Sequence, residues 1–282
     1  MDLRNQRVGV CQFRPLLGDI EKNLSKHLEW VERGREGGAD FLVFPELSLT
    51  GYRLRDLAGE VAVEADSPFW KPLQEASREM TLLVGFVEKD RDGVLYNSMA
   101  LFKPGCTSPF IYRKLRLPNF GMFEEKRFFK AGEKLGICET VLGRTGLLVC
   151  RDFLFPSLAY CHFSQGVKVI VCPSNAPLRG VEGAEFDSQR LWEDAAAAYS
   201  RFFSALVVYV NRTGFEDGYG FAGGSFVMEP GAKMVWKAPP LEETLGIVEF
   251  DKRCFARYEA LSGYLKEEDH GQIRRFLLSE GR

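Results

Sequence analysis

Apolar and polar positions along the chain alternate between two periods, a pattern that predicts strands interleaved with helices. Residues 7–13 (RVGVCQF) have the apolar and β-branched content of a strand. Residues 19–37 then place Leu24, Leu28 and Val31 on one face, as an amphipathic helix does. The short apolar run 40–44 stops at Pro45, which predicts a buried strand followed at once by a loop.

Segments of the same two kinds follow through the rest of the chain. Strands are expected at 81–87, 95–102, 147–150, 167–172, 205–210, 223–228, 232–236 and 245–250, and helices at 156–165 and 185–204. No linker rich in Pro, Gly or Ser divides this pattern. We therefore predict one α/β domain over residues 1–263, followed by a charged tail, residues 264–282, that lies on the surface or at a subunit interface.

Two segments of the first half recur in the second half. GADFLVFPE (38–46) resembles GVKVIVCPS (166–174), and NSMALFKPG (97–105) resembles GSFVMEPG (224–231). Two similar halves predict two sheets stacked face to face with helices outside them, although short strand sequences also resemble one another by chance. The arrangement would put Glu46 and Cys150 at carboxyl ends of strands, where α/β sheets bind ligands.

Composition narrows the classes of function. The chain has 282 residues, 45% of them hydrophobic, and its 37 Lys and Arg against 39 Asp and Glu give a net charge of −2. This balance argues against nucleic acid as a partner, and no apolar run approaches the roughly 20 residues that cross a bilayer. Seven cysteines without a CxxC motif, and an N-terminus without an apolar signal segment, predict a cytoplasmic protein with reduced thiols. With three histidines in the sequence, there are few candidate ligands for a zinc site and few candidates for the histidine of a Ser-His-Asp triad.

Cys150 is the first candidate for chemistry. It directly follows the apolar residues 147–149, and Pro156 marks the start of a helix soon after it. A sharp turn from strand to helix is the geometry that exposes a nucleophile. A free cysteine is also typical of a buried core, where it packs as a small apolar group. Position alone leaves both interpretations open.

Two charged residues lie in apolar surroundings. Glu46 follows FLVFP, a setting in which a partly desolvated carboxylate can accept a proton, but it can equally cap the turn at residues 47–50. Lys114 lies in YRKLRLP, where it can donate to a developing oxyanion or extend its stem over apolar surface. The local sequence does not decide between these roles.

In combination, the three residues and their surroundings resemble the nitrilase superfamily of carbon–nitrogen hydrolases. Glu46 lies in FPELSLTGY, Lys114 in YRKLRLPNFGMFEEKRFFKAGE and Cys150 in GLLVCRDF. The resemblance extends from Val8 to about Phe250 and includes NRTG (211–214) and GGSFVMEPGAK (223–233). It implies a four-layer αββα sandwich with pseudo-twofold halves, in agreement with the internal similarity, and assembly into a homodimer or a higher homo-oligomer.

The resemblance also implies a mechanism. Cys150 is expected to attack an amide carbon and form a thioester, with Glu46 as the general base. Lys114 and the backbone N–H of Arg151 are expected to stabilise the oxyanion. Glu125 matches the second glutamate of the family, which orients the substrate and the lysine. The positive charge of Lys114 is expected to lower the pKa of the Cys150 thiol. No metal and no organic cofactor is implied.

Residues that contact the substrate are suggested by the same resemblance. Tyr52 and Phe123 match pocket-lining positions, although both can also be core aromatics. Arg151, Asn175 and Ala176 are the other candidates. True nitrilases tend to have Trp-Glu after the cysteine, so Arg-Asp at this place points to amides as substrates. The loops 178–186 and 215–221 are expected to select the substrate.

Within the superfamily, FPELSLTGY, LPNFGMFEEKRFF and GGSF are most similar to the glutaminase domain of glutamine-dependent NAD synthetase. The sequence has no ATP-binding SGG-type loop, so the synthetase domain is missing and NAD synthesis by this chain alone is not expected. Ala176 stands where that glutaminase group has a serine that helps to hold glutamine. This difference puts glutamine itself in question.

Three functions stay open. The first is an amidase for a small linear amide, which is an ω-amide, an aliphatic amide or a carbamoyl compound. The second is a glutaminase-type subunit that supplies ammonia to a separate synthetase partner. The third is a catalytically silent scaffold, which the joint presence of Glu46, Lys114, Glu125 and Cys150 disfavours. We predict the amidase, acting on a small molecule without nucleic-acid or membrane partners.

Overall fold

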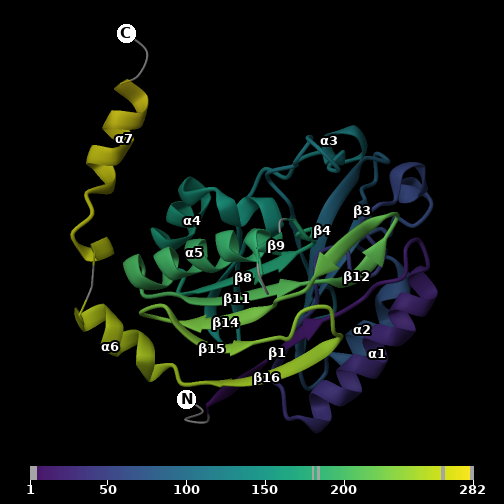
Figure 1. The fold of residues 1–282 in the computed structure, drawn as a ribbon, viewed down its shortest axis with the longest axis horizontal. Helices are drawn as coiled ribbons and strands as arrows, with labels where there is room; N and C mark the ends of the chain where they lie inside the picture. The colour runs from purple at the N-terminus through teal and green to yellow at the C-terminus, as the bar shows by residue number, and fades with distance from the viewer. Residues whose placement is uncertain (1–4, 180, 183–184, 262–263, 280–282) are drawn as a thin grey trace.

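Two six-stranded sheets form the centre of the molecule, and helices cover the outer face of each. Figure 1 shows this arrangement in a computed structural model that describes residues 5–179, 181–182, 185–261 and 264–279. Helices α1 (Ile20–Glu36) and α2 (Lys71–Ala76) lie on one side, and α4 (Pro156–Phe163) and α5 (Asp187–Phe202) on the other. The predicted αββα sandwich is confirmed.

The first sheet has the strand order β16-β1-β2-β3-β4-β5. Its strands are β1 (Gln6–Gln12), β2 (Phe41–Val43), β3 (Thr81–Lys89), β4 (Leu95–Phe102), β5 (Phe110–Arg113) and β16 (Thr244–Phe250). Strands β1, β2 and β3 are parallel, and β4, β5 and β16 are antiparallel to their neighbours. Strand β16 therefore brings the far end of the sequence beside the first strand.

The second sheet has the order β15-β14-β11-β8-β7-β6. Its strands are β6 (Gly136–Thr140), β7 (Gly143–Leu147), β8 (Val169–Ser174), β11 (Leu206–Asn211), β14 (Phe226–Glu229) and β15 (Lys233–Lys237). Strands β7, β8 and β11 are parallel, and the other three are antiparallel to their neighbours. Read from β6, the second sheet has the same succession of strand directions as the first sheet read from β16: one antiparallel strand, three parallel strands and two antiparallel strands. This correspondence is the internal similarity that the sequence predicts.

Shorter elements surround the two sheets. They are the 3₁₀ turns η1 (Arg55–Gly59), η2 (Pro68–Trp70), η3 (Cys150–Leu154) and η4 (Tyr264–Lys266), helices α3 (Glu125–Phe128), α6 (Arg253–Leu261) and α7 (His270–Ser279), and the strand pairs β9 (Val181–Glu182) with β10 (Glu185–Phe186) and β12 (Thr213–Glu216) with β13 (Tyr219–Ala222). Helices α6 and α7 lie beyond the sheet edges in Figure 1. The division of the chain at residue 263 stays a prediction. In the described segments, no helix has both the length and the apolar content that a bilayer crossing requires.

The core lies mainly between the sheets. Val10 of β1 and Leu83 of β3 pack in one cluster with Val171 of β8 and Val208 of β11, and none of these side chains is exposed. A second cluster on the outer face of the first sheet buries Trp30 of α1. Because both faces of the parallel strands are covered, these strands have continuous apolar sequences. The same packing fixes the strand ends that carry the polar residues described below.

Close packing at Gly85 of β3 sets the position of the loop that follows β2. A Cβ atom on Gly85 would lie 2.3 Å from the backbone N of Leu47 and 2.6 Å from the backbone O of Pro45. Backbone groups cannot move aside as the end of a flexible side chain can. The residue between them, Glu46, therefore keeps its place only if position 85 has no side chain.

We expect Gly85→Ala to lower catalytic activity by roughly 10- to 100-fold, because a displacement of about 1 Å is enough to misplace a reacting group. The variant is also expected to lose about 1–3 kcal/mol of unfolding free energy from overcrowding. Steady-state kinetics and urea unfolding measure the two effects. Gly59→Ala is the matched control, because its Cβ would meet open space. Unchanged kinetics in folded Gly85→Ala would contradict this account of the loop.

Candidate active site

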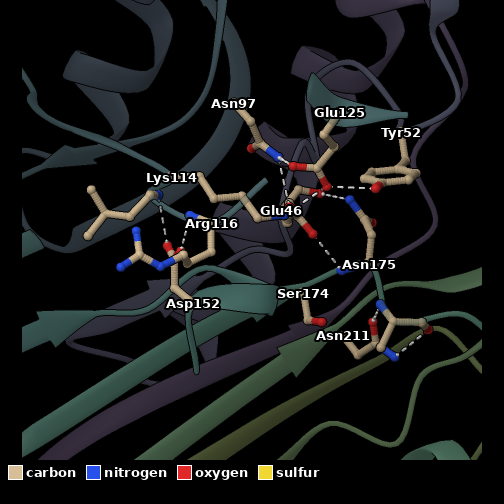
Figure 2. Close-up of polar contacts among 12 residues, drawn as sticks. Glu46, Tyr52, Asn97, Lys114, Arg116, Glu125, Asp152, Ser174, Asn175 and Asn211 are labelled. Atoms are coloured by element: carbon tan, nitrogen blue, oxygen red, sulfur yellow. Dashed lines mark hydrogen bonds and ion pairs between the residues drawn. The ribbon is translucent and has the colours of Figure 1, made fainter. Parts of the chain in front are cut away.

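Four predicted residues come together from both sheets, as Figure 2 shows for those that it labels. Glu46 follows β2 and Lys114 follows β5, both in the first sheet. Glu125 begins α3. Cys150 comes three residues after the end of β7 in the second sheet and begins η3. Stacking of the sheets therefore brings a thiol, an ammonium group and two carboxylates to one place.

The ammonium group of Lys114 joins the two carboxylates. Its Nζ donates to Glu46 Oε1 at 2.6 Å and to Glu125 Oε1 at 2.8 Å. The side chains of Lys114 and Glu46 are fully buried, and that of Glu125 is 3% exposed. Burial of three charged groups is costly unless they are paired and hydrogen-bonded. The arrangement therefore needs all three groups.

Neutral donors hold both carboxylates in place. Asn97 of β4 donates through Nδ2 to Glu46 Oε1 at 2.8 Å and, at 3.4 Å, to Glu125 Oε2. The hydroxyl of Tyr52 donates to Glu125 Oε1 at 2.6 Å. Asn175 donates its backbone N–H to Glu46 Oε2 at 2.9 Å and its Nδ2 to the backbone O of Glu46 at 2.8 Å. Both carboxylates are thus fixed in orientation before any substrate arrives.

The charges in this cluster shift one another's proton affinity. Burial lowers the pKa of Lys114, but the charges of Glu125 and Glu46 outweigh it, so the pKa lies well above the usual value and the ammonium is retained. Burial raises the pKa of Glu125 to about 7; Lys114 opposes this shift and Glu46 adds to it. Glu125 is consequently the group in the cluster that titrates near neutral pH.

Cys150 occupies a strained turn. Its φ of 47° lies in the left-handed region, which a non-glycine residue rarely adopts. The thiol is buried and lies near the hydroxyl of Ser174 and the charges of Glu46, Lys114 and Glu125. Burial, followed by the charge of Glu46, raises the pKa of the Cys150 thiol to about 12. Lys114 lowers this pKa, as predicted, but one ammonium does not offset burial and the charge of the nearby carboxylate.

Asp152 connects this turn to the segment that carries Lys114. Its carboxylate accepts the Tyr112 hydroxyl at 2.7 Å and the backbone N–H groups of Leu115 at 3.3 Å and Arg116 at 2.6 Å. Figure 2 shows Asp152 beside Arg116 and Lys114. The Asp152 carboxylate, from the turn that follows β7 of the second sheet, thus accepts three hydrogen bonds from residues in and after β5 of the first sheet. Asp152 therefore fixes the turn at Cys150 to the segment of Lys114 through backbone hydrogen bonds.

A cavity of about 320 Å³ opens onto Cys150. Phe123, Arg151 and Ala176, three of the residues predicted to contact the substrate, line it together with Phe120, Leu154 and Trp192. Most of the wall is apolar, and Arg151 and Arg179 are its charged residues among those described. The cavity is large enough for a small organic molecule.

Tyr52 and Asn175, which are also predicted to contact the substrate, lie outside the wall of this cavity. Tyr52 contacts Glu125 and Asn175 contacts Glu46, and neither lines the cavity at Cys150. Their hydrogen bonds orient the two carboxylates instead. The roles of all the predicted site residues in the reaction stay predictions, because geometry alone does not test them.

Sequence reasoning missed two supporting residues. Asn97 donates to both glutamates, and the hydroxyl of Ser174 lies near the thiol of Cys150. Glu216 of β12, inside the loop 215–221 that was expected to select the substrate, accepts the backbone N–H groups of Tyr52 and Arg53 at 2.9 and 2.7 Å. Asn97 and Ser174 both lie in the repeated segments, which was the available signal. Of the two loops expected to select the substrate, 215–221 forms the β12–β13 hairpin near Tyr52. The loop 178–186 lies partly outside the described residues.

Proteins of two kinds are similar in sequence to most of this chain. A glutamine-dependent NAD(+) synthetase of Thermotoga maritima is 30% identical over 254 residues, which cover 88% of this chain and 42% of the synthetase. A nitrilase of Pyrococcus abyssi is 29% identical over 266 residues, covering 87% of this chain and 89% of the nitrilase. The chain therefore spans less than half the length of the synthetases that it matches and most of the nitrilase.

Solved structures agree with the fold. The crystal structure of a carbon-nitrogen hydrolase from Helicobacter pylori G27 has a TM-score of 0.83 at 21% identity and covers 97% of this chain and 98% of its own. The family model for carbon-nitrogen hydrolases matches residues 7–257, a range that includes Glu46, Lys114, Glu125 and Cys150. On this evidence the chain belongs to the carbon-nitrogen hydrolase family and is a hydrolase of carbon–nitrogen bonds.

Proposed function

We propose that the protein is an amidase that hydrolyses the C–N bond of a small linear amide through a thioester on Cys150 and releases ammonia. The observation that carries this proposal is the buried Glu46–Lys114–Glu125 cluster directly facing a cysteine in a strained turn. A cluster of this composition supplies a nucleophile, a proton acceptor and an oxyanion donor at one point.

The first half of the reaction forms the thioester. The thiol of Cys150 is protonated at rest, because its pKa is raised to about 12. Glu46 accepts the thiol proton as the sulfur attacks the amide carbon. Lys114 and the backbone N–H of Arg151 stabilise the oxyanion, a contribution of about 3–4 kcal/mol for each donor. Glu46 then returns the proton to the leaving nitrogen, the C–N bond breaks and ammonia departs.

The second half regenerates the enzyme. A water molecule takes the place of the departed ammonia, and Glu46 accepts a proton from it as its oxygen attacks the thioester carbon. The C–S bond breaks, the carboxylic acid is released and Cys150 recovers its proton from Glu46. Glu125 keeps Lys114 in place throughout, since its carboxylate binds the ammonium at 2.8 Å. Bonds and protons balance to one amide and one water consumed for one acid and one ammonia.

Ammonia release from a panel of amides tests the proposal. The panel contains glutamine, ω-amides of dicarboxylates, short aliphatic amides and N-carbamoyl amines. We expect release from at least one class and its loss in Cys150→Ala, by roughly 10³-fold or more, since no other group can form the thioester. Cys11→Ala is a matched control, because Cys11 is also a buried cysteine and packs in the cluster on the outer face of the first sheet, away from Cys150. Equal release by wild type and Cys150→Ala would refute the mechanism.

A second candidate is a glutaminase-type subunit that supplies ammonia to a separate synthetase partner. The 30% identity with the Thermotoga maritima synthetase favours it. The methyl group of Ala176 in the cavity offers a substrate no hydrogen bond, which favours the amidase. Hydrolysis of glutamine that appears only with a partner would support the subunit. We also propose a cytoplasmic location and a homodimer or higher homo-oligomer, as the family resemblance implies.

A further inference from the structure

A second hollow adjoins the cavity at Cys150. It encloses about 660 Å³ and shares Pro118, Phe120 and Arg151 with that cavity as a common wall. Three of its lining residues are cationic, namely Arg116, Lys126 and Arg151, and its lining includes no Asp or Glu. Because Arg151 lines both spaces, a molecule whose amide lies at Cys150 can extend past Arg151 into the hollow.

The positive charge of the hollow is not neutralised within the described chain. Arg116, Lys126 and Arg151 make no ion pair with any described residue, whereas the neighbouring Arg127 pairs with Glu124 at 3.7 Å. The nearby carboxylate of Asp152 is fully buried and already accepts three hydrogen bonds. The three cations therefore keep their donors available for a ligand.

Two of these cations contact the same aromatic ring. The guanidinium groups of Arg116 and Arg151 lie 5.4 and 5.7 Å from the centre of the same ring, that of Phe155. Arg151 also lies 4.9 Å from the centre of the Phe120 ring, at the boundary between the two spaces. Two like charges on one ring repel each other, and an anion placed between them removes that repulsion. Guanidinium groups held in this way suit carboxylate and phosphate oxygens.

We propose that the hollow is an anion-binding subsite and that the substrate is an amide whose acyl part ends in a carboxylate or a phosphate. The inference rests on the proposed amidase function. Ammonia, the leaving group, is too small to carry the anion, so the anion belongs to the acyl part. The amide carbon lies at Cys150, the acyl chain passes the apolar wall and Arg151, and the anion binds between Arg151, Arg116 and Lys126.

Alkylating reagents that differ only at the far end test the subsite without a known substrate. N-substituted iodoacetamides of equal length are made with a terminal carboxylate, phosphonate, methyl or ammonium group. The rate of labelling is followed by mass spectrometry at Cys150 and at Cys161, an exposed cysteine in the same molecule that serves as the internal reference. The carboxylate and phosphonate arms distinguish the two kinds of anion.

We expect the ratio of anionic to methyl-terminated labelling to be roughly three- to tenfold higher at Cys150 than at Cys161 in low salt, and lower in high salt. Arg151→Gln and the double variant Arg116→Gln/Lys126→Gln are expected to remove this preference. Arg78→Gln, at an exposed position where the arginine forms no ion pair with a described residue, is the control that changes the charge equally to Arg151→Gln. Equal ratios at both cysteines, or a preference that survives in both variants, would overturn the subsite.

Measurement of amide turnover distinguishes failure of the anion-binding subsite from failure of the proposed amidase function. For a monoamide with a terminal carboxylate and its methyl-terminated counterpart, Lys126→Gln is expected to raise the ratio of KM for the anionic amide to KM for the methyl-terminated amide. Hydrolysis of both amides at equal kcat/KM would overturn the subsite and retain the amidase. Anionic preference in labelling without turnover of any amide would retain the subsite and refute the amidase. A Cys150 that reacts with none of the reagents would overturn both.

Discussion

Glu46→Gln is expected to lower kcat by roughly 10²- to 10⁴-fold and, at the same time, to speed the alkylation of Cys150 by iodoacetamide. Turnover fails because glutamine cannot accept the thiol proton. Alkylation requires only the thiolate, and the charge of Glu46 holds the pKa of that thiol up. Removal of the charge lowers the pKa, so more thiolate exists at every pH below it.

A slower hydrolysis together with a faster alkylation would indicate that the carboxylate of Glu46 accepts the thiol proton during the attack on the substrate. If Glu46 instead removed the thiol proton before substrate arrived, hydrolysis and alkylation would fall together in the variant. Both rates are measured from pH 6 to 9 on the same preparation, with alkylation read at the Cys150 peptide. Glu60→Gln, at an exposed position, controls for the loss of one negative charge.

Lys114→Met is expected to cost about 3–5 kcal/mol of unfolding free energy near pH 8.5, because it leaves two buried carboxylates without their cation. The loss should be smaller at pH 5.5. Lys114 lowers the pKa of Glu125, which still reaches about 7, so the variant raises that pKa further above the usual 4.5. A carboxyl with a raised folded pKa binds more protons folded than unfolded, so stability falls as the pH rises through that window.

Urea unfolding of wild type and variant at the two pH values measures this difference. Measurement at pH 5.5 also ensures that a folded variant is available for comparison. Lys71→Met, at an exposed position, is the control. The same loss of stability at both pH values would mean that the carboxylates stay neutral or hydrated without Lys114, which contradicts the buried cluster described above.

The sequence predicts the strands with continuous apolar residues better than the short ones. β5 (FIYR) and β6 (GICET) have only four and five residues with mixed polarity, and they form because β4 and β7 offer them backbone partners. The strand expected at 147–150 is β7, Gly143–Leu147, so the prediction overlaps it only at Leu147; the left-handed backbone of Cys150 already belongs to a turn. The pairing partner of a short strand and the backbone strain at Cys150 both depend on tertiary contacts. A local sequence pattern does not give those contacts.

Within the site, motif resemblance identifies the four charged or nucleophilic residues but not what surrounds them. Asn97 lies inside a strand whose sequence is typical of any buried strand, and only the register of β4 places it between two glutamates. The proton affinity of Cys150 is likewise set by burial and by residues distant in sequence. A prediction from the charge of Lys114 alone therefore gives the direction of that one contribution to the pKa of Cys150, but not the net shift.

The pairing of β16 with β1 has a consequence for the order in which the protein becomes functional during synthesis. The first sheet holds Glu46 and Lys114, but its outer strand comes from Thr244–Phe250. The second sheet holds Cys150, and Asp152 ties that segment to Leu115 and Arg116. A ribosome therefore has to reach Phe250 before the first sheet, which holds the base, is complete. Nascent chains stalled before Thr244 would carry every catalytic side chain and still be inactive.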